Sequence, residues 1–249
     1  MSKQGLLWGT LLLLYGTACQ RNWQPQQVEV QSYPIATVDT LAEDPEIADL
    51  IAPYKSQLEA EMNVVLGEVD QPLSKAQPES SLGNWAADAM HQSCERLSGK
   101  PIDFAIVNYG GLRIPQLPAG PLRRSKIYEL MPFDNKLVVL EANGSVVYQL
   151  FERMAAYGGW PISHTVRYRI EMGKAADVRI NGLPLTLKKI YRIGMTDFVA
   201  NGGDKCRFFE DQPRTELGEM YRDALLRFVE AETAAGRKIT AELEGRVSE

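Results

Sequence analysis

The sequence is poor in the residues that hold catalytic metals and that contact nucleic acid. Its 249 residues include only two histidines, His91 and His164, and only three cysteines. A hydrolase that holds two metal ions mainly through histidine cannot be built from this stock. Lysine and arginine number 27 against 32 aspartates and glutamates, for a net charge of −5. That balance excludes a basic nucleic-acid footprint.

The sequence also lacks an apolar run long enough to cross a bilayer. Its most apolar stretch, residues 6–14, is too short to span one and follows a single basic residue, Lys3. Small residues then lead to Cys19, an arrangement that resembles the lipobox of bacterial lipoproteins, in which this cysteine is lipidated. A plain signal peptide cut near Ala18 is the alternative. Both interpretations predict export, to the periplasm or the cell surface.

The chain divides into three parts by composition. We expect a signal peptide over residues 1–19, a flexible tether over 20–43 and one domain over 44–249. The last part, roughly 200 residues, is long enough for one hydrophobic core. In an oxidising compartment Cys94 and Cys206 could form a disulfide, although two unrelated thiols are the favoured interpretation.

Helix and strand signals alternate in the domain and predict an α+β fold with a mixed sheet flanked by helices. Asp44 and Pro45 open a helix with one apolar face, Ser80 or Ser81 caps a second, and Asn143 opens another. Further predictions are a short helix capped by Ser125, strands at 64–69, 102–107, 137–140, 166–170 and 191–196, a hairpin at Asn181-Gly182, and a last helix using Leu217, Tyr221 and Phe228.

Three loops at strand ends carry the candidate binding residues. The first, residues 108–113, joins two glycines to Arg113, whose planar fork suits phosphate. The second, 131–135, contains Phe133, which is either a core residue or a stacking face. The third, 196–204, contains Phe198, two glycines and Asp204. Taken singly each is a structural turn more often than a site, but two phenyl rings can sandwich a flat base.

The motifs as a set resemble the C-terminal domain of the 5′-nucleotidase and UDP-sugar hydrolase family. The resemblance covers about residue 44 to the C-terminus and rests on ordered motifs: Ser81-Leu82-Gly83-Asn84, Asn108-x-Gly-Gly-x-Arg113, Leu130-x-Pro132-Phe133, Asn181-Gly182-x-Pro184-Leu185, Tyr191-Arg192 and Asp197-Phe198-x-Ala-Asn-Gly-Gly-Asp204.

The resemblance implies a nucleotide-binding domain without catalytic residues. Phe133 and Phe198 would stack on the base, Asp204 would bind the ribose hydroxyls, and Asn108 and Arg113, with Gly111 between them, would hold the base or phosphate side. In that family a calcineurin-like phosphoesterase domain holds two divalent metals. Its histidine motifs are absent here, so we expect no cofactor in this chain and metals only in a partner.

Departures from the family pattern lie near the expected pocket. Lys75 is the only basic residue where the family places arginines, Tyr109 replaces a third glycine, and His164 replaces a glycine. His164 is expected to be a pocket-wall or surface residue. Three functions stay open: the specificity half of a split nucleotidase, a non-catalytic nucleotide- or nucleoside-binding lipoprotein, and a structural relic of the fold.

Overall fold

The computed structural model describes residues 44–249. Its contacts divide the chain into two units, Met1–Ala48 and Asp49–Glu249. The expected signal peptide, Cys19 and the expected tether lie outside the described residues. The second unit contains all the sheets formed by residues 44–249 and is the domain described below.

Helix α2 (Pro45–Met62) begins where the sequence predicts, and the Asp44 carboxylate accepts a hydrogen bond from the Glu46 amide at 3.0 Å. Its predicted apolar face is exposed: no α2 residue is buried, and Tyr54 is 74% exposed. Helical periodicity correctly predicts the helix, but it does not show whether another element covers the apolar face. No helix within residues 44–249 is both long and apolar enough to span a membrane.

A four-stranded mixed sheet forms the centre of the domain. Its strand order is β11 (Arg214–Met220), β6 (Lys136–Asn143), β10 (Ile190–Thr196) and β3 (Phe104–Ala105). Strand β3 is parallel to β10, whereas β6 is antiparallel to both β10 and β11. Successive side chains of β6 point to opposite faces, so Leu137 and Val139 join one hydrophobic core while Val138 and Leu140 join another.

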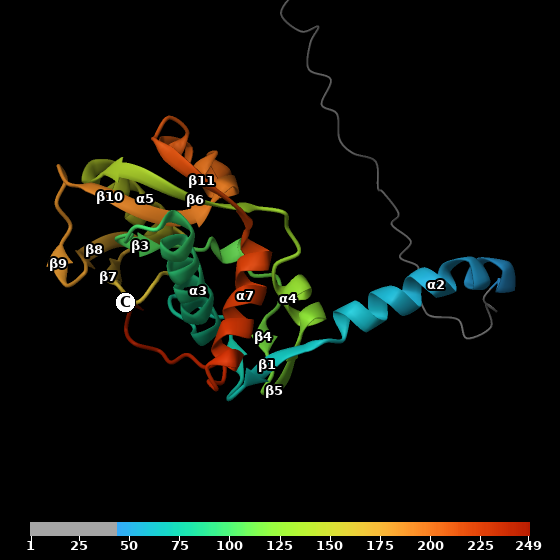
Figure 1. Cartoon of the computed structure of the whole chain (residues 1–249). Coiled ribbons are helices and arrows are strands. Elements are labelled where there is room, and N and C mark those ends of the chain that lie inside the picture. Colours follow the sequence, from blue (N-terminus) through green and yellow to red (C-terminus); the bar gives the residue numbers. More distant parts are fainter. Residues whose placement is uncertain (1–43) are drawn as a thin grey trace, which may run out of the picture. The chain divides into compact units, whose positions relative to one another are not determined.

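The first core lies under α3 (Ser81–Ser98), α4 (Arg124–Leu130) and α7 (Tyr221–Ala234), beside the two-stranded sheet of β1 (Val65–Val69) and β5 (Gly120–Arg123). Figure 1 shows α3 and α7 side by side. They are joined where the buried Tyr221 hydroxyl donates to the Ala86 carbonyl at 2.7 Å and where Trp85 meets the edge of Phe228. A second small sheet pairs β2 (Leu73–Ser74) with β4 (Gln116–Leu117).

The second core lies between the central sheet and another four-stranded sheet. Helix α5 (Gly144–Ala156) packs there with β7 (Val166–Glu171) and β8 (Lys174–Ile180). The predicted Asn181-Gly182 hairpin is confirmed, because these two residues connect β8 to β9 (Leu183–Pro184) and both have positive φ. Strand β12 (Val247–Ser248) pairs with β7 in parallel and completes this sheet.

The mixed α+β class is confirmed, and so are two of the predicted helix caps. The Ser80 hydroxyl accepts from the Gly83 amide, and the Asn143 side chain accepts from the Val146 amide. Two details are wrong. Helix α4 is preceded by Arg123 with no side-chain cap, so Ser125 lies inside the first turn. Leu217 lies in β11, because the chain pairs with β6 before α7 begins.

The two described cysteines are free and lie in different cores. Cys94 belongs to the first and Cys206 to the second, and both are buried. This agrees with the favoured interpretation of two unrelated thiols.

A buried arginine, Arg246, joins the C-terminal segment to α3 through an ion pair. Arg246 is 1% exposed and donates to both oxygens of Asp88, at 2.8 and 2.6 Å. It also donates to the Ile162 carbonyl at 2.9 Å, while Glu79 accepts the backbone amides of Glu244 and Arg246. These bonds join three parts of the chain that are far apart in sequence.

Candidate functional site

The three loops that carry the candidate residues meet at one edge of the central sheet. Ile193 pairs with Phe104 in parallel, and Thr196 pairs with Leu137 in antiparallel register. The ends of β3 and β10 and the beginning of β6 therefore lie at the same edge. The loop after β3, the loop after β10 and the loop before β6 are brought together there.

One cavity of about 240 Å³ lies between these loops. All six predicted binding residues line it. The sequence reasoning missed two further lining residues, Gly110 and Asn135. The complete lining is Asn108, Gly110, Gly111, Arg113, Phe133, Asn135, Phe198 and Asp204.

A short hydrogen bond links the first and third loops. Asn108 is 6% exposed, and its Nδ2 donates to Oδ2 of Asp204 at 2.6 Å. A Cβ on Gly111 would lie 2.8 Å from Asn108 Oδ1, so a side chain at this position would disturb the bond. The bond orients the one carboxylate among the lining residues.

The two phenylalanines differ in exposure. Phe198 is 43% exposed and lies on α6 (Asp197–Ala200), whereas Phe133 is half-buried against the first core. A Cβ on Gly203 would lie 2.6 Å from the Phe198 ring, so glycine is required beneath it. The Arg113 guanidinium lies 5.6 Å from the Phe133 ring centroid. An apolar ring with a cation beside it can receive both a base and an anionic group.

Lys75 lies beside this site, whereas the sequence identified it only as a departure from the family pattern. Its Nζ donates to the Leu112 carbonyl at 2.7 Å and lies 4.0 Å from the Tyr109 ring centroid. Burial lowers the pKa of Lys75, and the charge of Arg113 lowers it further. Neither cation forms an ion pair within residues 44–249. Two neighbouring unpaired cations favour an anionic ligand.

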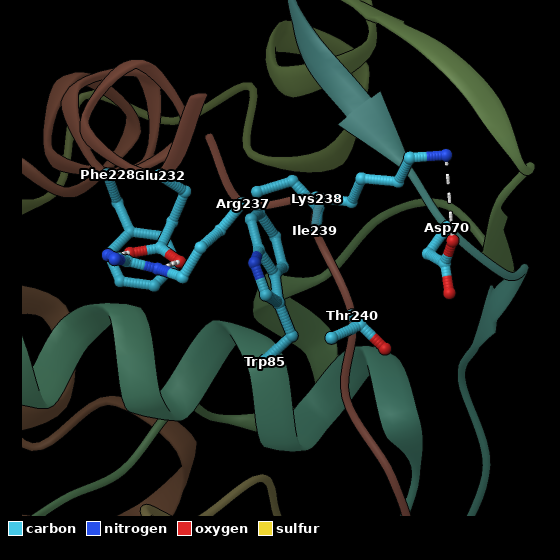
Figure 2. A pocket seen from close by; sticks show the side chains of 8 residues that line it. All are labelled: Asp70, Trp85, Phe228, Glu232, Arg237, Lys238, Ile239 and Thr240. Atoms are coloured by element: carbon cyan, nitrogen blue, oxygen red, sulfur yellow. Dashed lines mark hydrogen bonds and ion pairs between the residues drawn. The ribbon is translucent and has the colours of Figure 1, made fainter. Parts of the chain in front are cut away.

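A second cavity, of about 440 Å³, lies between α3, α7 and the segment that follows α7 (Figure 2). Its charged side chains pair with one another. Arg237 binds Glu232 at 2.6 Å, and Lys238 lies 3.7 Å from Asp70. Because these charges are already neutralised, the first cavity is the better candidate for a charged ligand.

The two histidines meet at a third cavity, of about 610 Å³. Their ring centroids are 5.3 Å apart. His91 is buried with Nδ1 3.3 Å from Ser163 Oγ, whereas the His164 side chain is 56% exposed with Nδ1 3.1 Å from Asp88. His164 is thus a surface residue on the wall of this third cavity, and it does not line the 240 Å³ cavity near which the sequence placed it. Within residues 44–249, no three His, Cys, Asp or Glu side chains form a group that could hold a metal ion.

We expect His91 to make the domain less stable in mild acid. Burial lowers the pKa of His91, with the Glu95 carboxylate opposing the shift. The unfolded chain, with a histidine pKa of about 6.5, then takes up this proton more readily than the folded chain does. The stability contribution is therefore complete above that pKa and is lost as pH falls through the lower folded value. Urea unfolding at about pH 7.5 and about pH 5 should show a smaller loss for His91→Asn than for the unchanged protein. An equal loss in both proteins would contradict the prediction.

Several known proteins are similar to this chain. The family model described as "5'-nucleotidase, C-terminal domain" matches residues 64–211, which contain all six predicted binding residues. The chain is 27% identical over 228 residues to the trifunctional nucleotide phosphoesterase protein YfkN of Bacillus subtilis, covering 83% of this chain and 15% of that protein. It is 29% identical over 172 residues to protein UshA of Yersinia enterocolitica, covering 66% and 30%.

A solved structure shows the same fold. The 5′-nucleotidase precursor from Thermus thermophilus superposes with a TM-score of 0.69 at 27% identity, covering 83% of this chain and 43% of that chain. The chain spans about a third or less of the length of these two curated relatives. On the family match and this fold, the chain belongs to the 5′-nucleotidase C-terminal domain family.

Proposed function

We propose that this chain binds a nucleotide or nucleoside in the 240 Å³ cavity and serves as the specificity half of a 5′-nucleotidase-type phosphoesterase. The observation that carries the proposal is the meeting of two phenylalanines, an arginine and an aspartate, from three separate loops, in one cavity. Phe133 and Phe198 would hold the base, Asp204 the ribose hydroxyls, and Arg113 with Lys75 the phosphate side.

Hydrolysis would be carried out by a separately encoded calcineurin-like metallophosphatase. Divalent metals in that partner would polarise the phosphoryl group and activate water. The present chain would orient the nucleotide, which is the part of catalysis that positioning alone can supply. Full-length relatives support the pairing, because this chain covers only 32% of protein UshA of Escherichia coli.

The nucleotide affinity expected of this chain alone is low, which favours binding by this chain together with a partner that also holds the nucleotide. Stacking on two faces, with the contacts of Arg113 and Asp204, sums to ~5–8 kcal/mol. Association costs ~4–15 kcal/mol in lost translational and rotational freedom. Binding by this chain alone is then expected in the millimolar range or weaker, ~−4 kcal/mol at the most favourable. Micromolar binding without a partner would instead support a non-catalytic nucleotide-binding lipoprotein.

Truncating either stacking ring should weaken nucleoside binding. In titrations of the purified protein with AMP, adenosine and UDP-glucose, Phe198→Ala and Phe133→Ala should each weaken binding about tenfold, because one face of the base loses its partner. Tyr148→Ala is the matched control, since Tyr148 is a 41% exposed aromatic outside the cavity. Unchanged affinity in both phenylalanine variants would exclude the base sandwich.

The partner is tested by activity. The purified chain should not hydrolyse AMP alone, and AMP hydrolysis should appear or rise when a calcineurin-like phosphoesterase encoded in a neighbouring gene is added with its metals. Phe198→Ala should then raise KM with little effect on kcat, because the ring contributes to binding and not to the chemical step. Equal rates with and without this chain would exclude the split enzyme.

We also propose that Cys19 is the lipid attachment site and that the domain lies outside the cytoplasmic membrane. A relative at 26% identity, from Listeria monocytogenes, is named cell wall protein Lmo0130. Incorporation of labelled fatty acid into the full chain, lost in Cys19→Ser, would support the anchor. Cleavage near residue 18 without lipid would support the plain signal peptide.

A further inference from the structure

Asp204 and the residue after it both have a left-handed backbone conformation. The φ of Asp204 is 50° and its ψ is 34°, and Lys205 follows with φ 68°. The left-handed region is unfavourable for most residues that carry a Cβ; aspartate tolerates it better than most, but lysine does not, so contacts with neighbouring groups help to hold these two successive residues there. Because Asp204 is the one acidic residue lining the cavity, the groups that hold it decide where the carboxylate of the site lies.

Hydrogen bonds fix Asp204 on both its backbone and its side chain, and the Cys206 thiol makes a weaker contact with the same backbone carbonyl at 4.0 Å. Arg153 donates from Nε to the Asp204 carbonyl at 2.7 Å. Asn108 donates to Oδ2 of the carboxylate at 2.6 Å. Within the described part of the chain, Oδ1 of Asp204 has no hydrogen-bond partner. This oxygen is therefore available to a ligand in the cavity.

The surroundings of Arg153 at the end of α5 leave its side chain free to contact Asp204. Arg153 lies half-buried in the last turn of α5, and its guanidinium is 5.3 Å from the Tyr157 ring centroid. The Tyr157 carbonyl accepts a hydrogen bond from Gln77 Nε2 at 2.8 Å, which fixes the end of the helix. Among residues 44–249, no carboxylate forms an ion pair with Arg153. Its polar contact is therefore directed to the backbone of Asp204.

The thiol of Cys206 lies close to both Arg153 and Asp204. Burial raises the pKa of Cys206 to about 12, while the charge of Arg153 opposes that shift and the charge of Asp204 adds to it. Arg153, Asp204 and Cys206 are thus close enough to interact, where α5 meets the loop that follows β10. Cys206 belongs to the second core and its Sγ lies 4.0 Å from the Asp204 carbonyl oxygen, so this core extends up to the binding loop.

We propose that Arg153 is a positioning residue of the binding site. Its hydrogen bond keeps Asp204 left-handed, so that the carboxylate accepts from Asn108 and directs Oδ1 to the 2′- and 3′-hydroxyls of a bound nucleoside. This inference rests on the proposed nucleotide-binding function. Without Arg153 the Asp204 carbonyl keeps only the weak thiol donor of Cys206, and the loop can relax to a conformation in which the carboxylate no longer faces the ribose.

The inference is tested with two ligands that differ only in the ribose. Adenosine carries both hydroxyls, whereas 2′,3′-dideoxyadenosine carries neither. The unchanged protein should prefer adenosine. Arg153→Met should weaken adenosine binding about tenfold, the value of one hydrogen bond to a charged group, and leave dideoxyadenosine binding unchanged. Arg153→Lys should restore part of the preference, because lysine donates without the planar fork.

Matched variants separate positioning from general damage. Arg169→Met removes an exposed arginine of β7 that pairs only with nearby Glu171, and it should change neither affinity. In an Asp204→Ala background, Arg153→Met should cause no further loss of adenosine binding, because the two residues act through one carboxylate. Additive losses in that double variant would overturn the inference.

The remaining outcomes are also distinct. Equal weakening of both ligands by Arg153→Met and Arg153→Lys would show a merely structural role and overturn the inference. An unchanged preference in both variants would overturn it as well. If the unchanged protein binds neither ligand, or binds both without any effect of Phe198→Ala, the proposed function fails and the inference fails with it.

Discussion

Replacing Arg246 with methionine is expected to lower the free energy of unfolding by about 2–3 kcal/mol, because a buried carbonyl loses its donor and the Asp88 carboxylate, whose side chain is 30% exposed, loses its charged partner. Arg246 is 1% exposed and makes a two-pronged contact with Asp88 and a bond to the Ile162 carbonyl. Methionine fills a similar volume but leaves the buried carbonyl without a donor and the carboxylate without its cation. Guanidinium-induced unfolding would measure the loss.

The matched control is Arg179→Met. The Arg179 side chain is 46% exposed and pairs with Asp177 at the surface. Exposed pairs contribute about 1 kcal/mol or less, so this variant should unfold close to the unchanged protein. Similar losses of stability in the two variants would contradict the role given to Arg246. Retained stability in Arg246→Met would mean that β12 and the C-terminal segment add little to the domain.

Replacing Gly144 with alanine is expected to destabilise the domain by about 2–3 kcal/mol, through overpacking against rigid backbone. An alanine Cβ would lie 2.2 Å from the Thr186 carbonyl oxygen and 2.8 Å from the Leu187 Cα. The direction of the change in stability is informative, because a glycine-to-alanine substitution inside an exposed helix normally stabilises a protein by about 1 kcal/mol. Thermal unfolding would distinguish the two directions.

Gly110→Ala is a suitable control for this prediction. A Cβ at Gly110 meets nothing within 4 Å, and its backbone is not in the left-handed region. The substitution should therefore leave the unfolding temperature nearly unchanged. If Gly144→Ala proves stabilising, the loop before β10 must move away from α5 more easily than its packing implies.

Local signals predicted the elements whose chemistry is contained within a few residues. Ser80 and Asn143 cap helices because each side chain reaches an amide three residues ahead, and Asn181-Gly182 forms a hairpin because both residues accept positive φ. Leu217 was misassigned because its spacing also fits the following helix. Only the pairing of β11 with β6, formed by residues far apart in sequence, places it in a strand.

The residues that line the candidate site could be predicted from the sequence, but the residues that contact its loops from outside the cavity could not. The residues that line the cavity stand in recognisable loop motifs, so sequence could name six of them. Arg153 and Lys75 act on those loops from α5 and from the segment after β2, and no spacing in the sequence connects them to the site. The periodicity of apolar residues in α2 likewise could not show that this face stays exposed in the folded chain.

The alternation of β6 between two cores has a consequence for local opening of the domain. Val138 and Val139 are adjacent in sequence but belong to different hydrophobic clusters, and the strand is paired on both edges, with β10 and with β11. The β6 amides that bond to β10 lie between two interior strands and reach solvent only when the centre of the sheet opens, whereas those that bond to the exposed edge strand β11 can exchange when β11 alone detaches. Hydrogen exchange of the first set should therefore proceed through global unfolding, and a destabilising change in either cluster should accelerate it.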